Sequence, residues 1–399
     1  MKAGSWRSIL GIYLFGVCGG STVSKIIPVG DDIARVFGLG PADFGWLVSL
    51  VAVPAALLAI PSGIVVDRFG PRLVLIIAAF VGVAANALYA VAPSLPFLQL
   101  ARLLEGVAIV HMYTAGPALM MATTEGKRRT SAMTLWATYM PVGTATGLAI
   151  GGLFAEGAYW RMAFVVAGLL FALVGLLGLL QPTPRIERQG PRPTIGAQLL
   201  ALRSAYSKPA LLLLALAFFL MIGLGLGANV TFPTYFSRIH HITIARASNM
   251  VALATLAMVP GSLLAGFILG KGVSRQWLFT GLALIGLVVG SLAFFPDLGL
   301  PVRYVVLALW FIASGAATAV LLATLPIVAE PERRGAAAAL INQAGSLATF
   351  LNPPIWLAFS TGRDWTPYGA LMAAGWGVAV LAMWLLAART AAVRTTAHA

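Results

Sequence analysis

The chain has 399 residues, of which 60% are hydrophobic and only 10% are charged, and its mean hydropathy is +0.92. Soluble domains carry about 25% charged residues, so this composition excludes a chain whose surface faces mainly water. The net charge of +14 does not indicate a nucleic-acid-binding protein, because the basic residues stand in short clusters between apolar runs. A membrane surface is the partner that this pattern favours.

Twelve apolar runs follow one another along the chain, and each is long enough to cross a hydrocarbon core of about 30 Å as an α-helix. The first six occupy residues 9–29, 44–66, 72–92, 97–121, 131–154 and 160–181. The second six occupy residues 210–236, 246–270, 276–295, 302–328, 335–359 and 366–388. The sequence therefore predicts an all-α membrane protein with twelve transmembrane helices.

The distribution of basic residues predicts the orientation of these helices. With the N-terminus inside, the inner segments hold 18 of the 26 Lys and Arg residues, and the outer segments hold six, including Arg303 and Arg363. Cytoplasmic loops of membrane proteins carry such an excess. Both termini are therefore predicted to be cytoplasmic, in a multi-pass protein of a bacterial inner (plasma) membrane.

A hydrophilic stretch rich in Pro and Arg, residues 182–209, separates the two sets of six spans and is expected to form a cytoplasmic linker. It divides the chain into an N-terminal half, 1–181, and a C-terminal half, 210–399. The halves echo each other at an offset of 205 residues, as in Trp160 before the sixth span and Trp365 before the twelfth. Two six-span halves in parallel repeat are a known plan of secondary transporters.

The loop between the second and third spans carries the most specific motif of the chain. It runs from Gly63 to Arg72 with the sequence GIVVDRFGPR. This resembles G-x-x-x-D-R-x-G-R-R/K, the signature loop of the major facilitator superfamily, with Pro71 at one normally basic position. Gly63 would allow two helices to approach closely, and Gly70 would allow a tight turn. The resemblance implies two six-helix halves in a pseudo-two-fold arrangement that give alternating access to a central site.

The resemblance also implies a gate on the cytoplasmic side. Asp67 is expected to form charge-assisted hydrogen bonds with nearby arginines and so to stabilise one state of the carrier. The predicted gate consists of Gly63, Asp67, Arg68, Gly70, Arg72, Arg128 and Arg129.

Two further motifs resemble patterns of the same superfamily. Residues 102–106, RLLEG, resemble the R-x-x-Q-G pattern of the fourth span, with Glu105 in place of Gln. Residues 143–152, GTATGLAIGG, resemble the antiporter stretch G-x-x-x-G-P-x-x-G-G, with Leu148 in place of Pro. Packing of a helix through small residues explains these glycines equally well.

Ionisable side chains within a span cost about 2.5–3.5 kcal/mol each on insertion scales and mark functional sites. Lys25 and Arg102 lie at similar depth in the outer part of the bilayer, and Glu105 lies one turn deeper on the same helix face as Arg102. The resemblance places these residues together beside the central cavity. The alternatives are snorkelling of the two basic side chains to the interface and, for His111, a satisfied core histidine.

Other polar residues could face the same cavity. The predicted substrate-binding or coupling positions are Lys25, Arg102, Glu105, His111, Tyr113, Tyr139, Asn229, Tyr235, Asn342 and Gln343.

No motif indicates a metal, a cofactor or an enzyme. Cys18 is the only cysteine, the four histidines have no ligand spacing, and no HExxH motif or nucleophile elbow is present in the sequence. A membrane-embedded enzyme and a non-transporting receptor are therefore weaker alternatives. The expected partners are the lipid bilayer, a small-molecule substrate and protons, and the expected oligomeric state is a monomer.

Two kinds of carrier remain open. Because Lys25 and Arg102 outnumber Glu105, a cavity with excess positive charge favours an organic anion such as a carboxylate as substrate. The alternative is a proton-coupled efflux antiporter for hydrophobic or cationic compounds, with Glu105 as the proton carrier.

Overall fold

The computed structural model describes residues 1–183, 206–294, 298–329, 334–359 and 364–396, together with Gly196 and Arg203. These residues form α-helices joined by short loops. Most of the predicted linker, as well as Arg333 and Arg363, lies outside the described residues.

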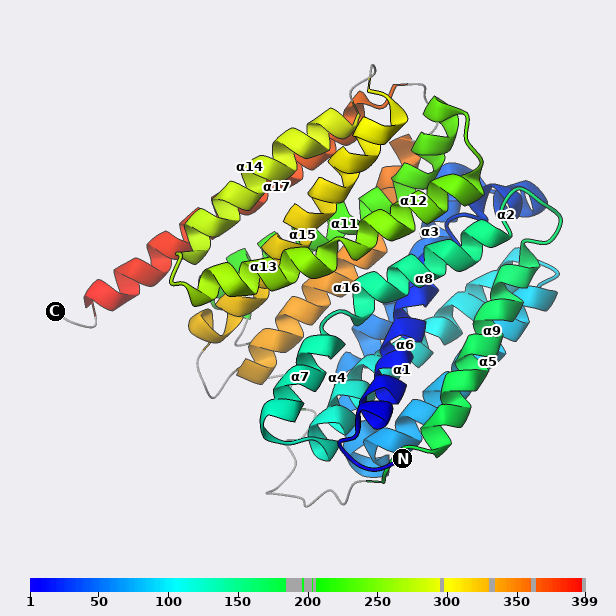
Figure 1. Ribbon diagram of the computed structural model, residues 1–399, viewed down its shortest axis with the longest axis horizontal. Helices are drawn as coiled ribbons and strands as arrows, with labels where there is room; N and C mark the ends of the chain where they lie inside the picture. Colours follow the sequence, from blue (N-terminus) through cyan, green and yellow to red (C-terminus); the bar gives the residue numbers. More distant parts are fainter. Residues whose placement is uncertain are drawn as a thin grey trace. The chain divides into compact units, whose positions relative to one another are not determined.

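Two series of helices make up the chain (Figure 1). The first consists of α1 (Trp6–Ser24), α2 (Gly30–Phe37), α3 (Pro41–Ser49), α4 (Ala52–Phe69), α5 (Pro71–Val91), α6 (Leu95–Thr123), α7 (Gly126–Trp136), α8 (Tyr139–Leu153) and α9 (Arg161–Leu179). The second consists of α11 (Pro209–His240), α12 (Ile244–Leu256), α13 (Met258–Gly270), α14 (Arg275–Ala293), α15 (Leu300–Val328), α16 (Arg334–Ala358) and α17 (Thr366–Thr396).

Nine helical segments within the described residues are long and apolar enough to cross a membrane. The expected spans 9–29, 131–154 and 335–359 are not among the nine, although the chain is helical there in α1, in α7 with α8, and in α16. The all-α membrane fold is therefore confirmed. The count of twelve spans and the cytoplasmic position of both termini stay predictions.

Three expected spans are each interrupted once, between α3 and α4, α7 and α8, and α12 and α13. The third residue after each interruption is a proline, namely Pro54, Pro141 or Pro260. Proline lacks the N–H group for an i→i−4 hydrogen bond, and its ring clashes with the carbonyl group four residues earlier. That carbonyl group lies at the interruption in each case, so the prolines explain where these helices break.

The chain divides by contacts into two compact units, residues 1–192 with 232–253 and residues 193–231 with 254–399. In the first unit α1 packs against α6, α8 and α9, and α5 packs against α6 and α9. In the second unit α15 packs against α13 and α14, and α14 packs against α17. The division of the chain into two six-helix halves stays a prediction.

Helix positions support the internal repeat that the sequence predicted. Helices α6 and α15 begin 205 residues apart and have the same length of 29 residues. Helices α9 and α17 also begin 205 residues apart, and Trp160 and Trp365 directly precede them.

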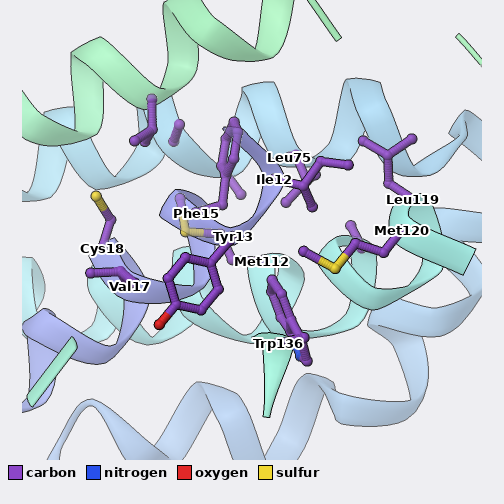
Figure 2. Packing of buried hydrophobic residues seen from close by; sticks show 14 of the residues in the cluster. Ile12, Tyr13, Phe15, Val17, Cys18, Leu75, Met112, Leu119, Met120 and Trp136 are labelled. Atoms are coloured by element: carbon purple, nitrogen blue, oxygen red, sulfur yellow. The ribbon is translucent and has the colours of Figure 1, made fainter. Parts of the chain in front are cut away.

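The first unit has an apolar core at one end of α1 (Figure 2). Phe15 of α1, Leu75 of α5, Met112 of α6 and Phe171 of α9 are all buried in it, with Trp136 of α7 alongside. This packing fixes α1 between α5, α6 and α9. The polar groups at the other end of α1 are thereby held in the interior of the unit.

Candidate functional site

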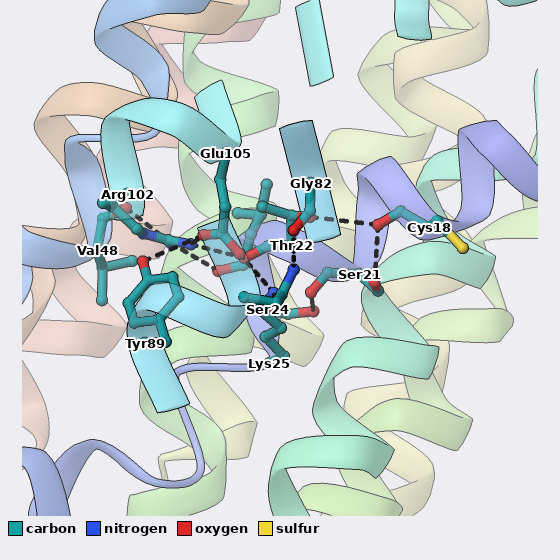
Figure 3. A network of polar contacts seen from close by, with 12 residues as sticks. Cys18, Ser21, Thr22, Ser24, Lys25, Val48, Gly82, Tyr89, Arg102 and Glu105 are labelled. Atoms are coloured by element: carbon teal, nitrogen blue, oxygen red, sulfur yellow. Dashed lines mark hydrogen bonds and ion pairs between the residues drawn. The ribbon is translucent and has the colours of Figure 1, made fainter. Parts of the chain in front are cut away.

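A network of buried polar side chains surrounds the C-terminal end of α1 (Figure 3). Lys25 is the C-cap residue of α1, and its backbone N–H donates to the Ser21 carbonyl at 3.0 Å. Arg102 and Glu105 lie one turn apart near the start of α6. The side chains of all three residues are 0% exposed.

Glu105 lies between the two basic side chains and pairs with both. One carboxylate oxygen, Oε1, forms an ion pair with Lys25 Nζ. The other, Oε2, accepts hydrogen bonds from Arg102 Nη1 at 2.9 Å and from the Tyr89 hydroxyl at 3.1 Å. We refer to Lys25, Arg102 and Glu105 as the charged triad.

Arg102 uses its whole guanidinium group within the protein. Besides Glu105 it donates to backbone carbonyls of α1, Thr22 at 2.7 Å and Val23 at 3.3 Å. It also donates to carbonyls of α3, Leu47 at 3.3 Å and Val48 at 2.9 Å. A guanidinium has five N–H donors, and these five hydrogen bonds occupy them. Arg102 therefore ties the ends of α1 and α3 to α6.

Lys25 has a second polar partner in Asn86 of α5, whose Oδ1 accepts a hydrogen bond from Nζ. The Asn86 amide is oriented by its own hydrogen bond to the Gly82 carbonyl at 2.8 Å. Three aromatic rings complete the surroundings of Nζ, with centroids at 5.8 Å for Tyr89, 5.5 Å for Phe164 and 5.8 Å for Phe171. Such distances allow cation–π attraction.

The structure brings together Lys25, Arg102 and Glu105, which the resemblance to the superfamily placed near one another. Since Lys25 and Arg102 are fully buried in the protein, the snorkelling alternative is wrong. Asn86 and Tyr89 were missed by the sequence analysis. Both are polar residues in the apolar run 72–92 and lie three positions apart, so their common helix face could have indicated the site.

The glycines of the antiporter-like stretch pack α8 against α1. A methyl group on Gly147 would lie 2.2 Å from Ser24 Oγ, and one on Gly151 would lie 2.3 Å from the Lys25 carbonyl oxygen. Ser24 Oγ also donates to the Thr144 carbonyl at 2.9 Å. This stretch thus holds the backbone of Lys25 in place, as expected for helices that pack through small residues.

The other predicted site residues of the first unit lie apart from the triad. His111 is half-buried, and its Nδ1 lies 2.8 Å from the Val107 carbonyl of its own helix. The rings of Tyr113 and Tyr139 lie 4.8 Å apart, and Tyr113 Oη is buried with no hydrogen-bond partner. Tyr235 is buried beside Phe232 and Phe236.

The predicted site residues of the second unit are scattered. Asn229 accepts a hydrogen bond from Thr255 at 2.8 Å, and Gln343 accepts one from Tyr206 at 2.7 Å. Asn342 is exposed. Their roles in binding or coupling stay predictions.

Arg303 was expected in an outer loop, but it lies in the first turns of α15 and is fully buried. Position 303 is the second residue of the predicted span 302–328, so the outer position of Arg303 stays a prediction.

Five residues of the predicted gate, Gly63, Asp67, Arg68, Gly70 and Arg72, lie at the end of α4 or the start of α5, and Arg128 and Arg129 lie in α7. Gly70 has a φ of 86°, the left-handed region that favours glycine, so the tight turn is confirmed. Arg72 donates to the Gly178 carbonyl at 3.2 Å and to the Leu179 carbonyl. Both carbonyls lie at the C-terminus of α9, where a positive charge is stabilised by the helix dipole. A methyl group on Gly63 would meet no described atom within 4 Å, and the close approach of a second helix to Gly63 stays a prediction.

The remaining gate residues bind nearby groups. Arg128 donates to the Gly4 carbonyl at 3.0 Å, and Arg129 donates to the Thr124 carbonyl at 2.8 Å. The guanidinium of Arg68 lies 5.4 Å from the ring of Phe69. The gating role of these residues and of Asp67 stays a prediction.

A polar cavity of about 250 Å³ lies in the first unit between α2, with Pro28 before it, and residues 234–244. Glu156, whose φ is 64°, accepts a hydrogen bond from the Ile244 N–H at 2.7 Å, and its own N–H donates to Asp32 at 3.0 Å. Glu156 therefore caps the N-terminus of α12. The residues of the charged triad do not line this cavity.

Comparison with known proteins identifies the family to which the sequence and the fold belong. The sequence profile of the Major Facilitator Superfamily matches residues 10–353. The uncharacterized MFS-type transporter YceJ of Bacillus subtilis (strain 168) is 25% identical over 300 residues, which cover 75% of each chain. The multidrug resistance protein Stp of Mycobacterium tuberculosis (strain CDC 1551 / Oshkosh) is 27% identical over 170 residues, 42% of this chain and 32% of Stp. The match thus spans about a third of the length of Stp.

Among solved structures, a bacterial homologue of the human lysosomal transporter Spinster, in its inward-facing and unoccupied conformation, has the same fold. The TM-score is 0.75 with 19% sequence identity, over 96% of this chain and 95% of that chain. The profile match, the membrane helices and the shared fold lead to one conclusion: this chain belongs to the Major Facilitator Superfamily and is a multi-pass membrane transporter.

Proposed function

We propose that this transporter is a proton-coupled exporter of hydrophobic or cationic compounds, and that the charged triad is its coupling site. The observation that carries the proposal is the complete occupation of Arg102. Its five donors are used by Glu105 and by four backbone carbonyls. An organic anion that entered this site would find no free N–H group on the guanidinium.

The second basic residue is occupied in a similar way. Lys25 contacts Glu105 and Asn86, and aromatic rings cover its remaining side. A buried anion needs charge-assisted partners to offset its desolvation, and the triad offers these partners to its own carboxylate. The triad therefore supports the organic-anion hypothesis less well than the proton-coupled alternative.

Buried ionisable groups that pair with one another are typical of proton relays in pumps and transporters. The name of one similar protein, the multidrug resistance protein Stp, agrees with efflux of foreign compounds. The net positive charge of the triad is the observation that still favours an anion, so the test must compare both substrate classes.

The test uses everted membrane vesicles with an acidic interior and two substrates, ethidium as a hydrophobic cation and benzoate as a carboxylate. We expect accumulation of ethidium that is lost when nigericin collapses the pH gradient, and no accumulation of benzoate. Arg35→Ala should transport ethidium as the wild type does, because the Arg35 side chain is 75% exposed and lies outside the triad. Accumulation of benzoate, or ethidium transport that ignores the pH gradient, would contradict the proposal.

A further inference from the structure

The charged triad is not electrically balanced. With all three residues ionised, two positive charges face one negative charge. Among the residues that the structure describes, the other ionisable groups that face Lys25 are Tyr89 of α5 and Cys18 of α1, which are neutral in their ordinary protonated forms. Helix α9 contributes only the rings of Phe164 and Phe171. The ionised triad therefore leaves one positive charge in a site whose side chains have no exposed surface.

Proton exchange at each member of the triad has a different electrostatic consequence. Arg102 does not deprotonate in proteins. Protonation of Glu105 would remove the only negative charge and leave two cations within a few ångströms of each other. Loss of a proton from Lys25 leaves the Arg102–Glu105 pair, whose charges cancel. Since an uncompensated buried charge is costly, Lys25 is the member whose proton can leave with a gain in charge balance.

The contacts of Lys25 suit both the charged and the neutral form. An ammonium can donate to Glu105 and Asn86 and direct its remaining charge toward the aromatic faces. A neutral amine can still donate to the same two oxygens, and the rings then serve as apolar lining. Arg102 stays in place in either case, because its carbonyl partners on α1 and α3 do not titrate.

We propose that Lys25, rather than Glu105, carries the coupled proton, a proposal that rests on the proton-coupled function above. The ammonium of Lys25 becomes an amine as its proton passes to water on the side where the site opens, and it regains a proton from the other side. Loss of the proton weakens the ion pair that joins the end of α1 to α6. The protonation state of Lys25 thus sets how firmly these two helices are held together.

The experiment measures ethidium in everted vesicles with and without an imposed pH gradient. Lys25→Met mimics the neutral form, and Lys25→Arg keeps the positive charge but cannot release a proton. We expect both variants to lose the gradient-driven accumulation while downhill movement of ethidium continues. Glu105→Gln should transport more slowly and still respond to the gradient. Lys271→Met is the control, because Lys271 is exposed.

Two results would overturn the proposal and leave the proposed function standing. One is a Lys25→Arg variant that stays coupled, since Lys25 would then act only as a fixed cation. The other is a Glu105→Gln variant that no longer responds to the pH gradient while both Lys25 variants still respond to it. If wild-type vesicles ignore the gradient, the proposed function itself fails.

A measurement on the wild-type protein covers the case in which the variants do not fold. The chain has only five lysines, so ¹³Cε-lysine labelling of the protein in nanodiscs gives few signals. Lys→Arg variants at Lys2, Lys127, Lys208 and Lys271 assign the other four signals, and the remaining signal belongs to Lys25. Addition of ethidium at fixed pH should move the Lys25 signal between the ammonium and amine positions. A Lys25 signal that does not move while ethidium binds would contradict the proposal.

Discussion

At the scale of single residues, Arg102 shows how a buried charge can serve structure and function together. Burial of an ion pair adds little to stability by itself, but removal of one partner leaves costly unpaired groups. The five acceptors of Arg102 belong to α1, α3 and α6. Its loss would therefore leave unpaired carbonyls at two helix ends as well as an unbalanced Glu105.

This arrangement predicts a large effect of a conservative change. In Arg102→Lys at most three donors replace five, so at least two buried acceptors lose their partner, at a cost of about 1–3 kcal/mol each. The melting temperature of the purified protein in detergent should fall by several degrees. Arg35→Lys is the matched control, because the Arg35 side chain is 75% exposed and its pair with Asp32 is long at 3.4 Å, so it should contribute little. Equal melting temperatures for wild type and Arg102→Lys would refute the structural role.

The sequence predicted part of this site. Two spans of opposite direction bring Lys25 and Arg102 to similar depth, with Glu105 one turn deeper, and the resemblance to the superfamily placed all three together. The sequence did not predict the carbonyl partners of Arg102, since these depend on where α3 ends, and residues 41–69 appeared as one span. The saturation of the guanidinium, which turned the proposed substrate class from anions to cations, depends on the carbonyls of α3 together with those of α1 and with Glu105.

At the scale of helices, the contact between α1 and α8 determines the position of Lys25. Three glycines spaced four residues apart, Gly143, Gly147 and Gly151, all face α1 without room for a methyl group. The sequence indicated close packing at this stretch, but it could not name the partner helix. The prolines alone could not have predicted the helix breaks at Pro54, Pro141 and Pro260, because α6 continues through Pro117 and α15 through Pro326.

We expect Gly147→Ala to displace α1 from α8, because the new methyl group would lie 2.3 Å from the Ser21 carbonyl oxygen as well as close to Ser24. Gradient-driven ethidium transport should be strongly reduced, and the melting temperature should fall. Gly281→Ala in α14 provides the matched control, since a methyl group there meets no described atom within 4 Å. Similar behaviour of the two variants would show that the α1–α8 contact does not matter for coupling.

At the scale of the whole molecule, the membership in the superfamily follows from the sequence pattern and from the fold alike. The signature loop from Gly63 to Arg72 identified the family, and the equal lengths of α6 and α15 agree with the predicted internal repeat. Transport direction and substrate depend on which hydrogen-bonding groups have no internal partner in the folded protein. No local sequence pattern shows which groups these are. The occupied donors of the triad, which only the folded protein shows, are what favours the proton-coupled function.

The most direct test of this function follows protons and substrate in one experiment. Purified protein is placed in liposomes that contain a pH-sensitive dye, and ethidium is added outside in the absence of any imposed pH gradient. A proton-coupled antiporter must release interior protons as ethidium enters, so the interior should become alkaline, and Lys25→Arg should abolish this change. Entry of ethidium without a change of interior pH, or with acidification, would contradict the account.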